Sequence, residues 1–326
     1  MPADIMNDQI TLSVVFSFRN EADVLAELID RVERVLSELQ INYELIFVND
    51  SSTDTSLSIL RARRSANSRI KIINMSRRFG NAPCVLAGLE KSCGDAVIYM
   101  DSDLQDPPEL IPSLIKRWQE GYDVVHTTRL SRHGESKLKL WLTDRAYRLI
   151  DWFSDLEIPR NTGDFKLLSR RAVESILEIK EIDPFMRGLS LWIGYKQIFV
   201  PYERSARQGG RTHYSLLNTM NPYAEFIRGL TAFSSVPLYF ALVIGFIVSC
   251  GAFFYLLLII VQRVLFDIHL PGWPAMMVTM LFLGGSILFT TGVLGIYVGK
   301  IYNEVRARPR FVIESMEGIE SDSSGS

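Results

Sequence analysis

Residues 97–108 read Val-Ile-Tyr-Met-Asp-Ser-Asp-Leu-Gln-Asp-Pro-Pro, an apolar run that changes abruptly into alternating carboxylates. This pattern predicts a buried strand that delivers acidic side chains to its exposed carboxyl end. Asp101 and Asp103, with the amide oxygen of Gln105 two residues further on, suit a hard divalent cation such as Mg²⁺ or Mn²⁺. The absence of Cys and His among them argues against zinc. An ordinary turn is the alternative, because Asp and Ser favour turns and the proline pair stops the strand.

The composition divides the chain into a mixed part and a strongly apolar part. The 326 residues are 48% hydrophobic, which is ordinary for a globular protein. From about Val236 onward, however, the apolar residues gather in two long blocks, whereas the first two thirds mix charged and apolar residues as a soluble α/β domain does. A net charge of −2 shows no basic excess, so nucleic acid is not expected as a partner.

Cysteine usage and the amino terminus predict a cytoplasmic domain. Cys84, Cys93 and Cys250 are an odd number without metal-ligand spacing, and they fit reduced thiols. The amino terminus has no basic region followed by an apolar run, so no cleaved signal sequence is predicted. The part of the chain before the apolar blocks is therefore expected to stay in the cytoplasm.

Strand-like and helix-like segments alternate along the first 130 residues. Strands are predicted at 10–18, 43–48, 70–75, 97–100 and 123–128, and helices at 22–39, after Ser51-Ser52-Thr53-Asp54, and at 82–91. Such alternation indicates parallel βαβ units, in which ligands bind beyond the carboxyl ends of the strands. Asn20, which is also placed to cap the first helix, and Asp50, Arg77 and Asp101 all follow strand ends.

These strand-end residues suggest a phosphate-binding crevice. A divalent cation, basic side chains and carboxylates at one edge of a sheet are what a nucleotide diphosphate would require. Each residue also has an ordinary structural explanation, because Asp50 could cap a turn and Arg77 could lie in a solvated loop.

Four segments taken together resemble the family 2 glycosyltransferases. They are Phe18-Arg19-Asn20-Glu21, Val48-Asn49-Asp50-Ser51-Ser52-Thr53-Asp54, Arg77-Arg78-Phe79-Gly80 and the run from Met100 to Glu109. More narrowly, the set is similar to the polyprenyl-phosphate sugar transferases, the group of dolichol-phosphate mannose synthase and bactoprenol glucosyl transferase. The resemblance extends from about residue 10 to residue 300 and implies a GT-A fold, a Rossmann-like α/β domain that binds nucleotide sugars.

The resemblance also implies the donor site. It places Asp50 near the nucleotide base, Asp101 and Asp103 at the diphosphate and metal, and Gln105 as a further metal ligand. The residues implied for nucleotide-sugar binding are Asn20, Glu21, Asp50, Arg77, Gly80, Asp101 and Ser102.

Two further segments carry the implied acceptor side. In the family, arginines at the position of Arg129 face phosphate, as a bidentate guanidinium can. The triplet Gly163-Asp164-Phe165 resembles the segment that presents an acid to the acceptor, so Asp164 either orients the acceptor or acts as a base. A turn acid before a strand is the alternative for Asp164. The residues predicted to be catalytic are Asp103, Asp164, Arg129 and Arg207.

The segment 203–215 contains three arginines and a glycine pair, which suits a basic loop that closes over phosphates. Contacts to the acceptor phosphate are expected from Arg129, Arg204, Arg207 and Thr212. The family pattern here is Arg, then Gly, then Ser-Lys-Tyr, and this chain has Thr212 and His213 in the Ser-Lys places. It also has Asn81 where a lysine is common, so individual phosphate contacts are not fixed by the resemblance.

The last third of the sequence predicts a membrane anchor. Residues 216–235 fit an amphipathic helix at the membrane surface, although a core helix would look the same. Uncharged apolar runs at 237–261 and 274–298 are each long enough to span a bilayer. Among lysines and arginines only Arg263 lies in the connection, whereas four follow the second run, so both ends are expected in the cytoplasm.

The predicted division is a catalytic domain at 1–215, the juxtamembrane segment at 216–235, a transmembrane hairpin at 236–299 and a tail at 300–326. Small residues recur every four positions at Thr291, Gly295 and Gly299, which suits close helix packing, and a homo-oligomer is expected. From Glu314 the tail is polar and acidic and is predicted to be disordered.

The residues and the resemblance together predict an inverting glycosyltransferase in a bacterial-type inner or plasma membrane. The reaction expected first is transfer of glucose from UDP-glucose to undecaprenyl or another polyprenyl phosphate at the cytoplasmic face. A UDP-aminoarabinose derivative or GDP-mannose is an alternative donor. A processive polysaccharide synthase is disfavoured, because only two spans are predicted and no Gln-x-x-Arg-Trp sequence occurs. A nonenzymatic nucleotide-sugar sensor or a membrane scaffold is the alternative of another class.

Overall fold

The computed structural model describes residues 11–130, 162–203, 236–266 and 272–319. They fall into two compact units. One unit contains the sheet and takes in the chain again from Pro309 onward, and the other contains two long helices. The predicted juxtamembrane helix at 216–235 lies outside the described residues.

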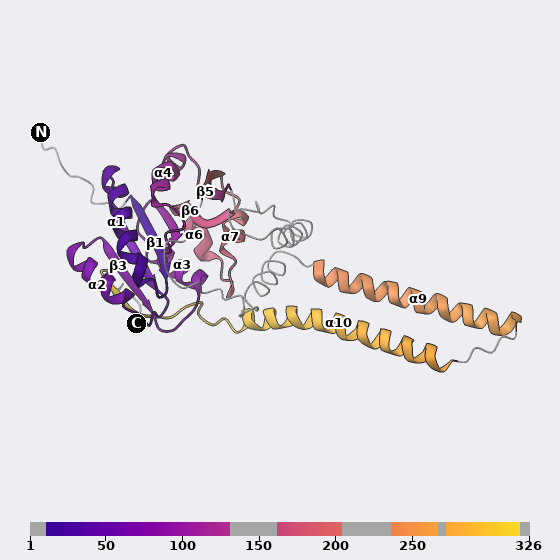
Figure 1. Cartoon of the computed structure of the whole chain (residues 1–326). Helices are drawn as coiled ribbons and strands as arrows, with labels where there is room; N and C mark the ends of the chain where they lie inside the picture. Colours follow the sequence, from indigo (N-terminus) through magenta and orange to yellow (C-terminus); the bar gives the residue numbers. More distant parts are fainter. Residues whose placement is uncertain (1–10, 131–161, 204–235, 267–271, 320–326) are drawn as a thin grey trace, which may run out of the picture. The chain divides into compact units, whose positions relative to one another are not determined.

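The first unit is built on an eight-stranded mixed sheet with the order β7-β5-β6-β4-β1-β2-β3-β8 (Figure 1). Its strands are β1 (Leu12–Phe18), β2 (Tyr43–Asn49), β3 (Ile70–Met75), β4 (Ala96–Asp101), β5 (Val124–Arg129), β6 (Thr162–Ser169), β7 (Gln197–Tyr202) and β8 (Ile313–Glu317). Strands β1 to β4 are parallel to their neighbours among the four, which confirms the βαβ prediction. Strand β6 runs antiparallel to both β4 and β5.

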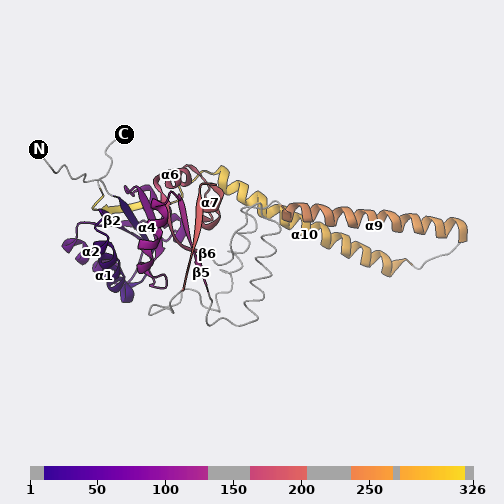
Figure 2. The same ribbon diagram turned by 90° about the horizontal axis from the view of Figure 1, so that it is seen from above.

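The helices of this unit are α1 (Ala22–Glu38), α2 (Ser56–Ala66), α3 (Asn81–Glu90), the 3₁₀ turn η1 (Pro108–Leu110), α4 (Ile111–Gln119), α6 (Arg170–Glu178) and α7 (Met186–Trp192). Helix α1 is strongly amphipathic, because its apolar residues recur every three or four positions and all of that stripe is buried. Helices α1 and α2 lie together, apart from α6 and α7 (Figure 2).

The period of two along the strands assigns side chains to the two faces of the sheet. Val14 and Phe16 of β1 and Ile98 of β4 belong to one apolar cluster with the stripe of α1. The alternate residues face the other way, where α3 packs so closely that a Cβ on Gly88 would come within 2.2 Å of Val15. The same alternation turns Asp101 toward the α3 face.

Strand β8 corrects the prediction for the carboxyl-terminal tail. Residues from Glu314 to Glu317 are not disordered, because Ile313–Glu317 pairs antiparallel with β3 and forms an edge of the sheet. The Arg61 guanidinium on α2 donates to Glu317 Oε1 from Nε at 2.9 Å and from Nη2 at 2.8 Å. The chain thus returns to the sheet after its second long helix.

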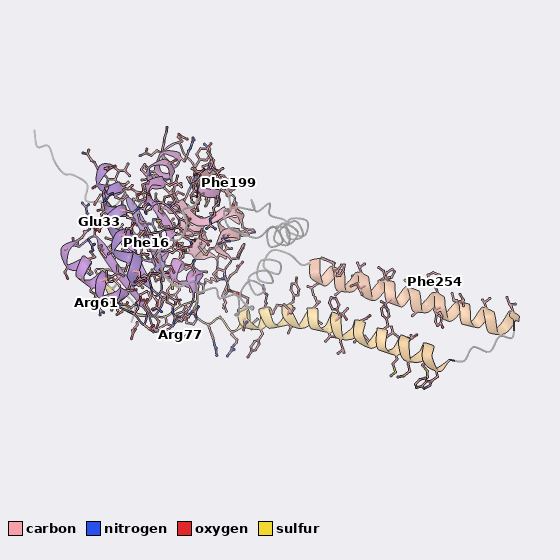
Figure 3. All side chains as sticks on the ribbon, viewed as in Figure 1. Phe16, Glu33, Arg61, Arg77, Phe199 and Phe254 are labelled. Carbon is pink, nitrogen blue, oxygen red and sulfur yellow. The ribbon has the colours of Figure 1, made fainter. Side chains whose placement is uncertain are left out.

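The second unit consists of α9 (Val236–Phe266) and α10 (Trp273–Val305), which contact each other. Each contains a stretch long and apolar enough to cross a membrane, Leu238–Tyr255 and Phe282–Val305, and these stretches fall at the two predicted apolar runs. Large apolar side chains project from both helices, such as Phe254, which is 67% exposed (Figure 3). Apolar side chains exposed at such density suit a lipid environment.

Candidate active site

A residue with positive φ, in the left-handed region, lies in the loop after each of the strands β1 to β4. Asn20 (φ 55°), Ser51 (φ 55°), Gly80 (φ 98°) and Leu104 (φ 57°) follow β1, β2, β3 and β4 respectively. For residues other than glycine this conformation costs about 1–2 kcal/mol. Such outliers cluster at functional sites, and here they share the sheet edge where ligands of open α/β sheets bind.

The loops after β1 and β2 are held together by hydrogen bonds. The backbone N–H of Asn20 donates to Ser52 Oγ at 3.1 Å. The side-chain oxygen Oδ1 of Asn20 accepts from the backbone N–H of Thr53 at 2.8 Å. The prediction that Asn20 caps α1 is wrong, because the side chain that accepts from the first turn, at the Ala22 amide, is that of Asp54, at 3.2 Å. The two loops therefore form one continuous wall at the edge of the sheet.

Glu21 and Asp50 are both buried within this wall. The Glu21 amide donates to Ser56 Oγ at 3.0 Å. Asp50 accepts from the Phe79 amide at 2.6 Å and from the Gly80 amide at 3.1 Å, one with each carboxylate oxygen. Asp50 thus ties the end of β2 to the loop before α3, a structural role that the sequence offered as the alternative to base recognition.

Arg77 is exposed on the loop after β3 (Figure 3). Its guanidinium lies 4.0 Å from the centroid of the Phe79 ring, a cation–π distance. Its Nη1 donates to the Arg78 carbonyl at 3.1 Å, and the rest of the guanidinium edge can still donate to an anion such as phosphate.

The acidic stretch after β4 occupies the same edge. Nδ2 of the Asn81 side chain donates to Asp101 Oδ1 at 3.4 Å. The backbone N–H of Gln105 donates to Asp103 Oδ1 at 3.1 Å. Ser102 is buried and donates to the Ser17 carbonyl at 3.1 Å. The turn passes through the left-handed Leu104, whose side chain is anchored in the core.

Negative charge is concentrated around Asp101. Burial, followed by the repulsion of Asp164, Asp106 and Asp103, raises the pKa of Asp101 to about 7. A divalent cation would relieve the repulsion among these carboxylates, since hard cations bind carboxylate and amide oxygens. No group of three His, Cys, Asp or Glu side chains within the described ranges is placed to hold a metal. Asp101, Asp103 and the side-chain amide of Gln105 offer oxygen donors of the kind that a hard divalent cation prefers, with phosphate and water able to complete its coordination.

Asp164 lies on β6 beside this acidic stretch. Antiparallel pairing ends with Tyr99 matched to Lys166, two residues before Asp101 and two after Asp164. The two carboxylates lie close enough for Asp164 to be the main charge that raises the pKa of Asp101. Arg187 of α7 donates to both Asp164 oxygens, from Nε to Oδ1 at 2.7 Å and from Nη2 to Oδ2. The acid is thus held in a bidentate pair, which fixes its orientation.

Lys166 attaches the same helix to the same strand. Lys166 is completely buried, and its Nζ donates to Ser190 Oγ at 2.9 Å, while the Ser190 hydroxyl donates to the Arg187 carbonyl at 3.1 Å. The ammonium also lies 5.6 Å from the centroid of the Tyr99 ring. Because Asp164 and Lys166 are two apart on a strand, and Arg187 and Ser190 three apart on a helix, one face of each element makes both contacts.

The charges in this cluster shift one another. Burial alone would raise the pKa of Asp164, but Arg187, Lys166 and Arg129 outweigh it and lower the pKa to about 2. Burial lowers the pKa of Lys166 to about 7, against the attraction of Asp164. Asp164 is therefore a carboxylate at any physiological pH, and a weak proton acceptor.

Arg129 ends β5 on the same side of the site. Its Nε donates to the Tyr202 hydroxyl at 3.2 Å, and that hydroxyl donates to Asp106 Oδ1. Arg129 Nη2 lies 4.0 Å from Asp106 Oδ1. Burial, Asp106 and its hydrogen bond raise the pKa of Tyr202 to about 12. The three side chains form a network that fixes the guanidinium before any ligand arrives.

The predicted site residues therefore fall into three groups. The first group lies at the carboxyl ends of β1 to β4 and comprises Asn20, Glu21, Asp50, Arg77, Gly80, Asp101, Ser102, Asp103 and Gln105. The second group is Arg129 on β5 and Asp164 on β6. Arg204, Arg207 and Thr212 lie outside the described residues. Sequence reasoning missed Arg187, Lys166 and Tyr202. A lysine inside the apolar strand segment Phe165-Lys166-Leu167-Leu168 was the one signal available.

Comparison with known proteins identifies the family. Residues 13–177 match the glycosyl transferase family 2 domain. An uncharacterized glycosyltransferase of Bacillus subtilis is 38% identical over 316 residues, which cover 97% of this chain and 97% of that protein. The bactoprenol glucosyl transferase of Shigella phage SfX is 37% identical over 305 residues, which cover 93% of this chain and 99% of that protein.

Solved structures agree on the fold. Mannosyl-3-phosphoglycerate synthase from Rubrobacter xylanophilus matches with a TM-score of 0.50 at 18% identity, over 68% of this chain and 73% of that chain. A match at that identity concerns the fold alone, and it confirms the GT-A-like mixed sheet. The chain therefore belongs to glycosyltransferase family 2, and it is a glycosyltransferase.

Proposed function

We propose that this protein transfers a sugar from a nucleotide sugar to a polyprenyl phosphate, with inversion at the anomeric carbon. The observation that carries the proposal is the joining, in one chain, of the acid and arginine site at the sheet edge to two helices long and apolar enough to span a membrane. The similarity to the phage bactoprenol glucosyl transferase covers both parts, since it extends over 93% of the chain.

On the donor side, Asp101, Asp103 and the Gln105 amide would hold Mg²⁺ or Mn²⁺. The bound ion would neutralise the charge that grows on the departing diphosphate. Asn20, Glu21, Asp50, Arg77, Gly80 and Ser102 form the surrounding edge and would contact the nucleotide directly or shape the loops that do. The donor favoured first is UDP-glucose, with a UDP-aminoarabinose derivative or GDP-mannose as the alternative.

On the acceptor side, the fixed guanidinium of Arg129 would bind the lipid phosphate, together with Arg204, Arg207 and Thr212. A phosphate monoester has a second pKa of about 6, so its oxygen is largely ionised near neutral pH and needs no strong base. This agrees with the pairing of Asp164 to Arg187, which lowers the pKa of Asp164 and leaves it suited to orienting the acceptor. Asp164 is accordingly assigned a positioning role.

The membrane arrangement is part of the same proposal. The two apolar helices would form a hairpin in a bacterial-type inner or plasma membrane, preceded by the juxtamembrane segment at 216–235. The catalytic unit and both termini would then face the cytoplasm, where nucleotide sugars occur, and the assembly would be a homo-oligomer.

The experiment is a donor panel with purified full-length protein in detergent or nanodiscs. UDP-glucose, a UDP-aminoarabinose derivative and GDP-mannose would each be incubated with undecaprenyl phosphate and Mn²⁺ or Mg²⁺, and lipid-linked sugar would be measured by mass spectrometry. We expect product from one donor, lost in chelator. Binding of nucleotide without turnover on any donor would overturn the proposal and favour a sensor.

A further inference from the structure

A chain of hydrogen bonds joins the carboxyl-terminal strand to the loop after β2. Asn74 of β3 donates from Nδ2 to Ser315 Oγ of β8 at 3.0 Å. Asn49, which ends β2, donates from Nδ2 to Asn74 Oδ1 at 3.0 Å, and the Ser52 amide donates to Asn49 Oδ1 at 2.9 Å. Ser52 Oγ then accepts from the backbone N–H of Asn20 at 3.1 Å, so this series of hydrogen bonds reaches the loop after β1.

The two amides in this chain are buried. Asn49 is 4% exposed and Asn74 is 5% exposed, so each depends on protein partners for its hydrogen bonds. Each amide has a fixed donor and a fixed acceptor end, and the chain therefore selects one orientation for both. Removing the Ser315 hydroxyl would leave the buried Asn74 Nδ2 without its acceptor, so that only the bond from Asn49 would still hold this orientation.

The same residues line an open pocket of about 350 Å³ at the carboxyl ends of β2 and β3. Asn49, Asn74, Ser51 and Ser315 provide neutral amide and hydroxyl groups, Glu314 adds a carboxylate, and Leu57 contributes an apolar wall. The one arginine of its lining, Arg61, is labelled in Figure 3. It is paired with Glu317 at 2.8 Å.

This chemistry fits the nucleoside better than the diphosphate end of a donor. A nucleoside is uncharged and is recognised by hydrogen bonds and apolar contact. A diphosphate would need a metal and uncommitted cations, and the metal-binding acids Asp101 and Asp103 are absent from this lining. Ser51, which lines the pocket, is the left-handed residue of the loop that carries Asp50.

We propose that β8 is part of the nucleotide site: Ser315 is a positioning residue that, through Asn74 and Asn49, sets the loop Asp50–Thr53 against the nucleoside of the donor. The inference rests on the proposed function, since it takes the ligand at this edge to be a nucleotide sugar. It assigns to the segment after the second apolar helix a role in donor affinity.

The test measures nucleoside binding to purified full-length variants by isothermal titration calorimetry, with UDP and uridine as probes, or GDP and guanosine if the donor panel selects guanine. Ser315→Ala should weaken nucleotide and nucleoside by the same factor, about 10-fold, as expected for one lost hydrogen bond. Ser315→Thr keeps the hydroxyl and should bind within about twofold of wild type. An equal loss of affinity for UDP and for uridine would show that Ser315→Ala affects the part of the site that binds the nucleoside.

Glu317→Gln is the matched control on the same strand, because it weakens the pair with Arg61 and leaves the amide chain intact. It should lower the melting temperature and keep nucleoside affinity. In Asn74→Ala, where the chain is already broken, adding Ser315→Ala should weaken binding no further.

Three results separate the hypotheses. Wild-type affinity in Ser315→Ala overturns this inference alone, and so does an equal loss in Glu317→Gln, which would mean that β8 acts only by staying attached. A folded wild-type protein that binds neither uracil nor guanine nucleotides overturns the proposed function, and this inference with it.

Discussion

Arg187 on α7 donates to both carboxylate oxygens of Asp164 on β6. The pair lies beside Asp101, so an acid that the sequence placed at the acceptor is neutralised by a partner 23 positions along the chain. The relationship favours the positioning role that we propose for Asp164, because Arg187 helps to lower the pKa of this carboxyl to about 2 and so makes it a weak proton acceptor.

Replacing Arg187 by alanine should add an acidic limb to the pH–rate profile. In the wild type Asp164 stays ionised, since its pKa is lowered to about 2, and it contributes no pH dependence near neutrality. Without Arg187 the largest of the opposing charges is lost and the pKa of Asp164 rises, so the rate should fall toward the acidic end of the profile. Turnover measured from pH 5 to 9 checks this.

Arg187→Lys and Asp164→Asn are the controls. The lysine keeps the charge and should move the acidic limb only part of the way. The asparagine cannot ionise, so adding Asp164→Asn to Arg187→Ala should remove the limb altogether. A limb that persists in the double variant would contradict the assignment and would point to Asp101, whose pKa Arg187 also lowers.

Asp103→Asn should lower turnover at least about 100-fold, since it replaces a proposed metal ligand by a neutral amide of the same size. The fold should survive because Asp103 lies beyond the end of β4. Mn²⁺ affinity, measured by calorimetry without donor, should fall in parallel. Wild-type turnover in this variant, or turnover undiminished in excess chelator, would be incompatible with the metal assignment.

Lys166→Met should flatten the dependence of stability on pH. The pKa of Lys166 is lowered by burial from 10.5 to about 7, so between these values the unfolded chain holds a proton that the folded chain lacks. The free energy of unfolding of the wild type therefore rises with pH across that window. The destabilisation caused by burying Lys166 is fully present below pH 7. Melting temperatures from pH 6 to 9 measure the slope, with exposed Lys196→Met as the matched control. Equal slopes in all three proteins would refute the prediction.

Tyr202→Phe should raise the KM for the lipid acceptor several-fold and leave the KM for the donor unchanged. The phenol bridges Arg129 to Asp106, and without it the guanidinium keeps its charge but loses its fixed position. Arg129→Lys should act in the same direction and more strongly, because lysine cannot bind phosphate in a bidentate way. An effect confined to the donor KM would place Arg129 at the diphosphate.

The alternation of strands and helices could be predicted because each element carries its own periodicity. Seven consecutive residues of β2 are buried, and the stripe of α1 repeats every three or four residues, so local sequence was sufficient. The positions of Asp101 and Arg129 at strand ends followed from these periods.

What could not be predicted depends on contacts between distant segments. Strand β8 is a short edge strand of half-buried and exposed residues with two glutamates. Its partner β3 lies some 240 positions earlier, as the Asn74–Ser315 bond shows. No local pattern marks such a pairing. Arg187 likewise lies in a short helix without a motif, and only the packing of α7 on β6 brings it to Asp164.

Strand β8 also sets an order of events during synthesis. The ribosome makes β3 early, but its partner emerges only after both apolar helices have been translated, so the outer edge of β3 stays unpaired until both helices have been made. Unpaired edges are sites of mispairing and aggregation. A chain that stops within α10 would therefore leave the ribosome with an open sheet, and a soluble catalytic fragment would have to rejoin residues from Pro309 onward rather than end before the helices.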